Sequence, residues 1–75
     1  MIKLKKETVQ VNSQAIKKAD YNYDNKVLKL TFVNGRKYAY KNVPRFTFMG
    51  MREAHSIGKF INKYIIRKYE CESTR

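Results

Sequence analysis

The sequence predicts an α+β fold, in which an antiparallel β-meander of three to four strands is followed by two short helices packed on one face. Three observations lead to this prediction. Apolar and polar residues alternate between residues 23 and 43, which is typical of strands with one buried face. Asn34-Gly35 interrupts the alternation and is a strong hairpin signal. After residue 43, apolar residues recur at helical spacing and need a sheet face to pack on.

Two further strands are expected before the hairpin. Residues 8–13 alternate valines with polar residues, and residues 16–23 place an alanine and two tyrosines on one face. Asp24-Asn25 is a turn signal that leads into the next strand. Because short strands joined by tight turns pair with their neighbours, these segments predict a meander.

The Asn34-Gly35 turn allows two registers, which exclude each other because a slip of one residue moves the side chains of a strand to the opposite face. A three-residue loop with Gly35 as a left-handed bulge residue pairs Phe32 with Arg36. We favour this register because it gathers five large side chains on one face: Leu28, Leu30, Phe32, Tyr38 and Tyr40. A two-residue loop pairs Val33 with Arg36 instead, and turns both tyrosines outward as a base-stacking platform beside Arg36, Lys37 and Lys41.

The first helix is expected over residues 44–54, with Pro44 in its first turn, where a missing N–H costs nothing. Its inward side chains are Phe48, Met49 and Met51. Ser56 is the predicted N-cap of a second helix. The apolar stripe of that second helix consists of Ile57, Phe60, Ile61, Tyr64 and Ile65.

The length of 75 residues predicts a single domain over residues 8–69. Residues 1–7 are expected to be a flexible basic arm, and residues 70–75 a disordered tail without apolar periodicity. The sequence has no apolar run of about 18 residues, which predicts no membrane span. Cys71 is the single cysteine and has no partner for an internal disulfide, so we expect a reducing, cytoplasmic setting.

Charge is the strongest functional signal in the composition. Seventeen Lys and Arg residues against six Asp and Glu residues give a net charge of +11. The excess is spread along the chain and not confined to one tail. A field of this sign attracts polyanions, which favours contact with nucleic acid. A basic composition that serves only solubility is the simpler alternative.

The candidate phosphate contacts lie mainly on the second helix. Lys59, Lys63 and Arg67 are spaced four residues apart and are expected to form one row. Ser56 and the N–H groups at the start of that helix can bind a phosphate, and Gly58 allows a close approach. The alternative is an ordinary solvated helix face with a packing glycine. The remaining candidates are Arg36, Lys37, Lys41 and Arg45.

The chain carries an ordered set of positions: Ser13, Tyr23-Asp24, Phe32, Gly35, Tyr38, Tyr40, Val43-Pro44, Ala54, Ser56, Gly58, Phe60 and an Ile at 65 or 66. This ordered set resembles the KTSC domain, a small module of phage and bacterial proteins that also occurs at the C-terminus of some lysyl-tRNA synthetases. The resemblance covers residues 11–69. At Gln14 the chain departs from the pattern, which has a small hydroxyl residue there, and the departure bears on a local cap at Ser13.

No catalytic constellation is visible in the sequence. His55 and Ser56 are adjacent, and adjacent side chains rarely form a nucleophile–base pair. One His and one Cys do not make a metal site, so we expect no metal and no cofactor. We therefore expect a non-enzymatic binding module whose partner is RNA or DNA. The alternative is a phage or bacterial protein-interaction module that docks on an acidic surface of a host protein, with no membrane partner.

Overall fold

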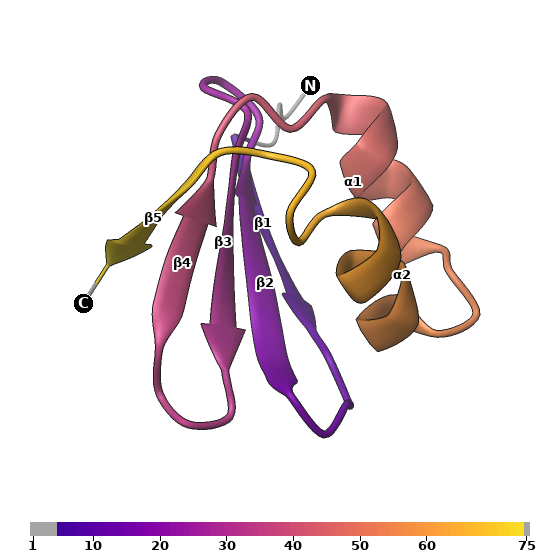
Figure 1. The fold of residues 1–75 in the computed structure, drawn as a ribbon. Coiled ribbons are helices and arrows are strands. Elements are labelled where there is room, and N and C mark those ends of the chain that lie inside the picture. The colour runs from indigo at the N-terminus through magenta and orange to yellow at the C-terminus, as the bar shows by residue number, and fades with distance from the viewer. Residues whose placement is uncertain (1–4, 75) are drawn as a thin grey trace.

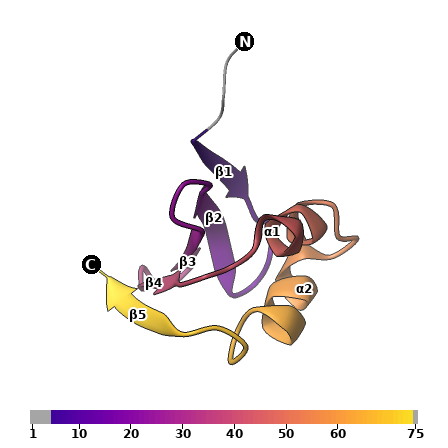
Figure 2. The same cartoon turned by 90° about the horizontal axis from the view of Figure 1, so that it is seen from above.

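A computed structural model describes residues 5–74 and shows an α+β fold. Five strands form one antiparallel sheet in the order β1-β2-β3-β4-β5, and both helices cover the same face of it (Figures 1 and 2). The predicted meander and its helical layer are confirmed, with one strand more than expected. In chain order the elements are β1 (Lys6–Gln10), β2 (Ile16–Asn22), β3 (Val27–Phe32), β4 (Lys37–Tyr40), α1 (Arg45–Arg52), α2 (Ile57–Tyr64) and β5 (Cys71–Thr74).

The β3–β4 hairpin has the bulged, three-residue register. The N–H of Phe32 donates to the carbonyl of Arg36 at 2.8 Å, and Gly35 has φ +89°. Leu28 lies opposite Tyr40, and Leu30 lies opposite Tyr38. Tyr40 is only 4% exposed. This register therefore excludes the outward-facing pair of tyrosines, and with it the base-stacking platform at that position.

The core lies between the sheet and the two helices. Tyr21 stacks on Phe48 of α1, with ring centroids 4.4 Å apart and the planes at 9°. The hydroxyl of Tyr21 donates to the carbonyl of Val43 at 2.6 Å, so the buried phenol is satisfied. Other buried core residues are Ala19, Leu28, Leu30, Met51, Ile61 and Ile65. Of the predicted inward residues, Phe48 and Met51 are buried, and Met49 is half-buried.

The C-terminal segment corrects one expectation. Residues 70–75 were expected to be disordered, but Cys71–Thr74 forms β5, which pairs with β4 and places Cys71 opposite Tyr40. The amide of Lys41 also donates to the carbonyl of Glu70 at 2.8 Å. An edge strand is held mainly by main-chain hydrogen bonds, so it needs no alternation of apolar and polar residues. This segment therefore gave no strand signal in the sequence.

At the other end, the boundary of the expected basic arm also shifts. Of residues 1–7, the first four lie outside the described residues, whereas Lys6 and Glu7 belong to β1. The first strand therefore ends at Gln10 and not at Ser13. Ser13 lies in the loop between β1 and β2, where its position relative to α2 becomes important.

The predicted N-cap of α2 is confirmed, whereas α1 (Arg45–Arg52) is shorter than the expected 44–54 at both ends, and α2 ends earlier than its apolar spacing predicts. Pro44 is the N-cap of α1, and Ser56 is the N-cap of α2, with its hydroxyl accepting the N–H of Lys59 at 3.3 Å. α2 ends at Tyr64, and Arg67 follows in a turn with φ +71°. The expected row of three cations therefore holds for Lys59 and Lys63 only.

Candidate nucleic-acid interface

The segment that contains α2 carries positive charge and no carboxylate of its own, and it is bounded by Glu53 and Glu70. Between residues 54 and 69 the chain carries four Lys or Arg residues and no Asp or Glu. Lys59 and Lys63 lie one helical turn apart and are both exposed. Arg67 and Lys68 follow in the turn after the helix and are also exposed. The charge of this segment therefore favours the binding of anions. In the fold, all four of its cationic side chains are exposed to solvent.

An aromatic side chain accompanies these cations. Tyr64 is 47% exposed, and its ring centroid lies 4.8 Å from that of Phe60. The ammonium nitrogen of Lys63 lies 5.3 Å from the Tyr64 ring centroid, within the range of a cation–π contact. The expectation that Tyr64 belongs to the core stripe is wrong, because α2 ends at this residue and the fully buried Ile65 contacts the core instead.

Two concavities flank the first turns of α2. One, of about 440 Å³, lies between α2 and the β1–β2 loop, and its lining includes Ser13, Phe32, Asn62 and Ile66. The other, of about 400 Å³, is lined by His55, Phe60, Lys63 and Tyr64, among others. Ser56 and Lys59 line both concavities. Lys59 therefore stands on the ridge that separates them.

Gly58 faces the β1–β2 loop and not an open surface. A Cβ atom on Gly58 would lie 2.9 Å from the Cβ of Ser13, so the two segments touch at this point. The hydroxyl of Ser13 accepts the N–H groups of Ala15 at 3.2 Å and of Ile16 at 2.9 Å. The local cap is present despite Gln14. Gly58 therefore makes a packing contact. The missing side chain leaves room for Ser13 and not for a ligand.

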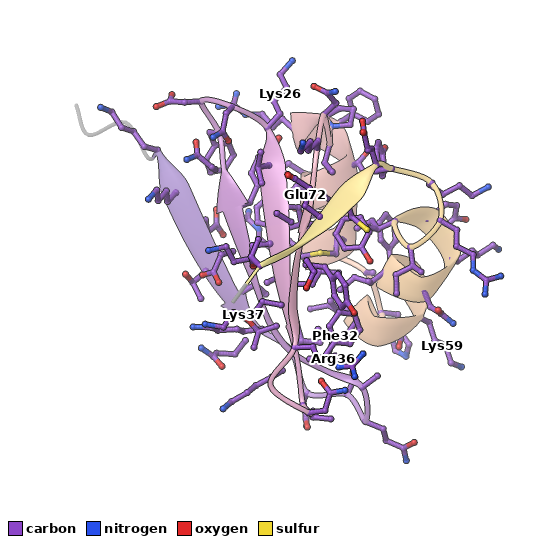
Figure 3. All side chains as sticks on the ribbon, turned by 60° about the vertical axis from the view of Figure 1, so that its left-hand side comes forward. Lys26, Phe32, Arg36, Lys37, Lys59 and Glu72 are labelled. Carbon is purple, nitrogen blue, oxygen red and sulfur yellow. The ribbon has the colours of Figure 1, made fainter. Side chains whose placement is uncertain are left out.

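Arg36 lies beside Phe32 at the turn end of the β3–β4 hairpin, and Lys59 lies at the same end of the molecule (Figure 3). Arg36 is exposed and pairs with Phe32, so both belong to the sheet face that the helices cover. The Phe32 ring packs edge-on against Tyr38, with centroids 5.6 Å apart. Of the residues predicted from the sequence, Ser56, Lys59 and Lys63 therefore lie together, whereas Arg36 lines a separate concavity between the hairpin turn and β5.

The structure places three predicted residues elsewhere. Lys37 lies on the uncovered face of the sheet, on the opposite side from Lys59 (Figure 3). Lys41 forms an ion pair with Glu72, with 3.1 Å between nitrogen and oxygen. Arg45 lies over the ring of Tyr23, 5.1 Å from its centroid, at the start of α1. These cations do not extend the α2 surface.

The uncovered sheet face carries Lys37 and three further lysines that are not among the candidates predicted from the sequence. Strand alternation and register place them on this face, together with Asp20 and Glu72. Asp20 accepts a hydrogen bond from the hydroxyl of Thr8, and Glu72 is paired with Lys41. This face therefore carries both signs of charge, whereas residues 54–69 include no Asp or Glu. The lysines are Lys6, Lys18, Lys29 and Lys37.

Arg52 of α1 is engaged by a carboxylate of β1. Its guanidinium donates to Glu7 at 2.6 Å, and the hydroxyl of Tyr23 donates to the other oxygen of the same carboxylate at 2.6 Å. The hydrogen bond from Tyr23 and the contact with Arg52 together lower the pKa of Glu7, although partial burial opposes the shift. Arg52 therefore joins α1 to β1 and is not available to an external anion.

The hydroxyl of Ser56 is occupied as a helix cap, and the adjacent His55 is exposed. Within residues 5–74, no group of three or more His, Cys, Asp or Glu side chains is arranged to hold a metal ion. In the same range, no helix combines the length and the apolar character needed to cross a bilayer. The α2 surface therefore presents exposed ammonium groups next to an aromatic ring, with a concavity on each side of Lys59.

Comparison with known proteins gives three findings. The family model of the KTSC domain matches residues 12–69. A curated protein of Tsukamurella paurometabola is 38% identical over 61 residues, which cover 81% of this chain and 91% of that protein. The crystal structure of a KTSC domain protein from Yersinia pestis matches with a TM-score of 0.83 and 28% identity, covering 93% of this chain and 99% of that chain.

Proposed function

This chain belongs to the KTSC domain family, and from its geometry we propose that it is a small non-enzymatic module that binds nucleic acid through phosphate contacts on α2. The observation that carries the proposal is the acid-free surface from residue 54 to residue 69, with exposed Lys59 and Lys63 beside the half-exposed Tyr64. Lysine supplies the charge that phosphates need, and an aromatic face supplies a surface for bases.

Phosphate contacts supply most of the affinity in this proposal. Each phosphate that a lysine neutralises releases condensed counterions and makes binding salt-dependent, with a slope of about −0.9 per contact on duplex DNA and about −0.7 on a single strand. Lys59 and Lys63 are the principal contacts, and Arg36 is a further one at the end of the hairpin. The net charge of +11 steers the polyanion to the domain.

Binding of labelled single-stranded and double-stranded DNA and RNA across a salt series tests the proposal. The Lys59→Gln/Lys63→Gln variant is expected to weaken binding at least tenfold at low salt and to lower the salt slope by about 1.5. The matched control is Lys6→Gln/Lys29→Gln, which removes the same charge from the uncovered sheet face. Absence of binding at low salt, or equal losses in the two variants, would contradict the proposal.

A second function is favoured by a different observation. Phe46 on α1 is 78% exposed, and exposed aromatic side chains are common anchors of protein interfaces. A protein-interaction module would use the basic surface to find an acidic partner in a reducing cytoplasm, where the lone, exposed Cys71 stays a thiol. Capture from a nuclease-treated lysate separates the two functions: an acidic partner that is retained by the unaltered chain and lost with Phe46→Ala supports this one.

A further inference from the structure

The ridge formed by Lys59 has a concavity on each side, and the two differ in character. The first has Phe32 and Ile66 in its lining, with the exposed Asn62 amide among its polar groups. The second contains the paired rings of Phe60 and Tyr64. A cation between two partly aromatic hollows matches the repeat of a nucleic-acid strand, in which a phosphate joins two flat bases.

We propose that the ligand of this surface is an unpaired strand, whose phosphate lies on Lys59 while the two bases that it joins occupy the two concavities. The inference rests on the proposed function, since it specifies which form of nucleic acid the α2 surface binds. Ser56 also lines both concavities, and because its hydroxyl accepts the N–H of Lys59, its own O–H can still donate to a phosphate that the ammonium group of Lys59 holds by charge.

The first concavity suits a base because it combines apolar walls with an amide. Phe32 is half-buried and comes from the end of β3, Ile66 comes from the turn after α2, and the Ser13 loop closes the third side. The Asn62 side chain carries both a donor and an acceptor, which is what the edge of an unpaired base requires. The concavity has a volume of about 440 Å³ and is open to solvent.

The second concavity suits stacking without selection among bases. Tyr64 presents a ring that is 47% exposed, and Phe60 supports it at a centroid distance of 4.8 Å. Lys63 lies over the same ring, so a base that stacks on Tyr64 displaces this ammonium group, which can then contact a phosphate of the strand. A duplex cannot use either hollow, because its bases are stacked and paired inside the helix.

The first experiment compares three probes of equal phosphate content: a ten-nucleotide oligothymidylate or oligouridylate, an abasic strand of the same length, and a duplex. We expect the strand with bases to bind about 30-fold or more tightly than the abasic strand, because two stacked bases each contribute. If the abasic strand binds equally well, the inference fails while the proposed function stands. If no probe binds at low salt, both fail.

The second experiment uses variants at exposed positions to test whether each of the two concavities holds a base. Tyr64→Ala and Asn62→Leu are each expected to weaken binding of the base-containing strand about fivefold or more, and to leave binding of the abasic strand unchanged. Phe46→Ala is the matched control, since it removes an exposed aromatic ring from α1. An unchanged affinity of Tyr64→Ala or Asn62→Leu would show that its concavity holds no base and would overturn the two-base arrangement.

Discussion

Gly58 of α2 and Ser13 of the β1–β2 loop are in direct contact: a Cβ atom on Gly58 would lie 2.9 Å from the Ser13 Cβ. The two residues are far apart in the sequence, and each is fixed locally, Ser13 by the N–H groups of its own turn and Gly58 by the first turn of a capped helix. Their contact sets the distance between the loop and α2. That distance determines the width of the first concavity.

Gly58→Ala is expected to lower the free energy of unfolding by about 1–3 kcal/mol, because the added methyl group meets a Cβ atom that cannot rotate away, and this clash outweighs the gain in helix propensity. Urea unfolding followed by circular dichroism measures the change. Gly50→Ala is the control: its Cβ would meet only the tip of the half-buried Phe60 ring, at 3.3 Å, and alanine gains about 1 kcal/mol of helix propensity. Equal destabilisation by the two substitutions would contradict this explanation.

The hairpin could be predicted because its register follows from local chemistry. Gly35 allows the left-handed bulge, and only that register places Tyr38 and Tyr40 opposite Leu30 and Leu28. The end of α2 could not be predicted in the same way. Arg67 adopts φ +71° without a glycine, so the usual sequence signal of a helix end is absent. The apolar spacing also continues to Ile65, beyond the last helical residue.

The candidate site was predictable in part for a similar reason. Lys59 and Lys63 follow from helical spacing alone. The first concavity does not, because Ser13 and Phe32 reach it from separate strands and loops, and nothing in their local sequence indicates a groove. The exposure of Tyr64 is likewise a consequence of where α2 stops.

Removal of residues 71–75 tests the role of β5. We expect a loss of roughly 1–2 kcal/mol in unfolding free energy, because several main-chain hydrogen bonds to β4 disappear and the Lys41–Glu72 surface pair adds little. The amide of Lys41, which donates to Glu70, should exchange with solvent faster in the truncated chain. Unchanged exchange at Lys41 would show that the strand does not form.

Glu72→Gln in the full-length chain is the control for that truncation, since it removes only the surface ion pair and should change stability by well under 1 kcal/mol.

The Tyr40 hydroxyl gives a second measurement. Burial, and then the neighbouring Cys71, raise the pKa of Tyr40 to about 12. Truncation uncovers the tyrosine and removes Cys71, so its pKa should fall towards its ordinary value of 10.

The Glu7 carboxylate predicts how stability depends on acid. The hydrogen bond from Tyr23 and the contact with Arg52 hold the pKa of Glu7 below its ordinary value of 4.5 in the folded chain. The unfolded chain therefore binds the proton more readily, and stability falls as the pH drops from about 5 through the folded pKa. Glu7→Gln should flatten this part of the curve of unfolding free energy against pH. Glu70→Gln is the control for the loss of one carboxylate, since Glu70 is exposed and its side chain makes no hydrogen bond or ion pair within residues 5–74. If Glu7→Gln keeps the full acid slope, the Tyr23–Glu7–Arg52 contact is not what joins β1 to α1.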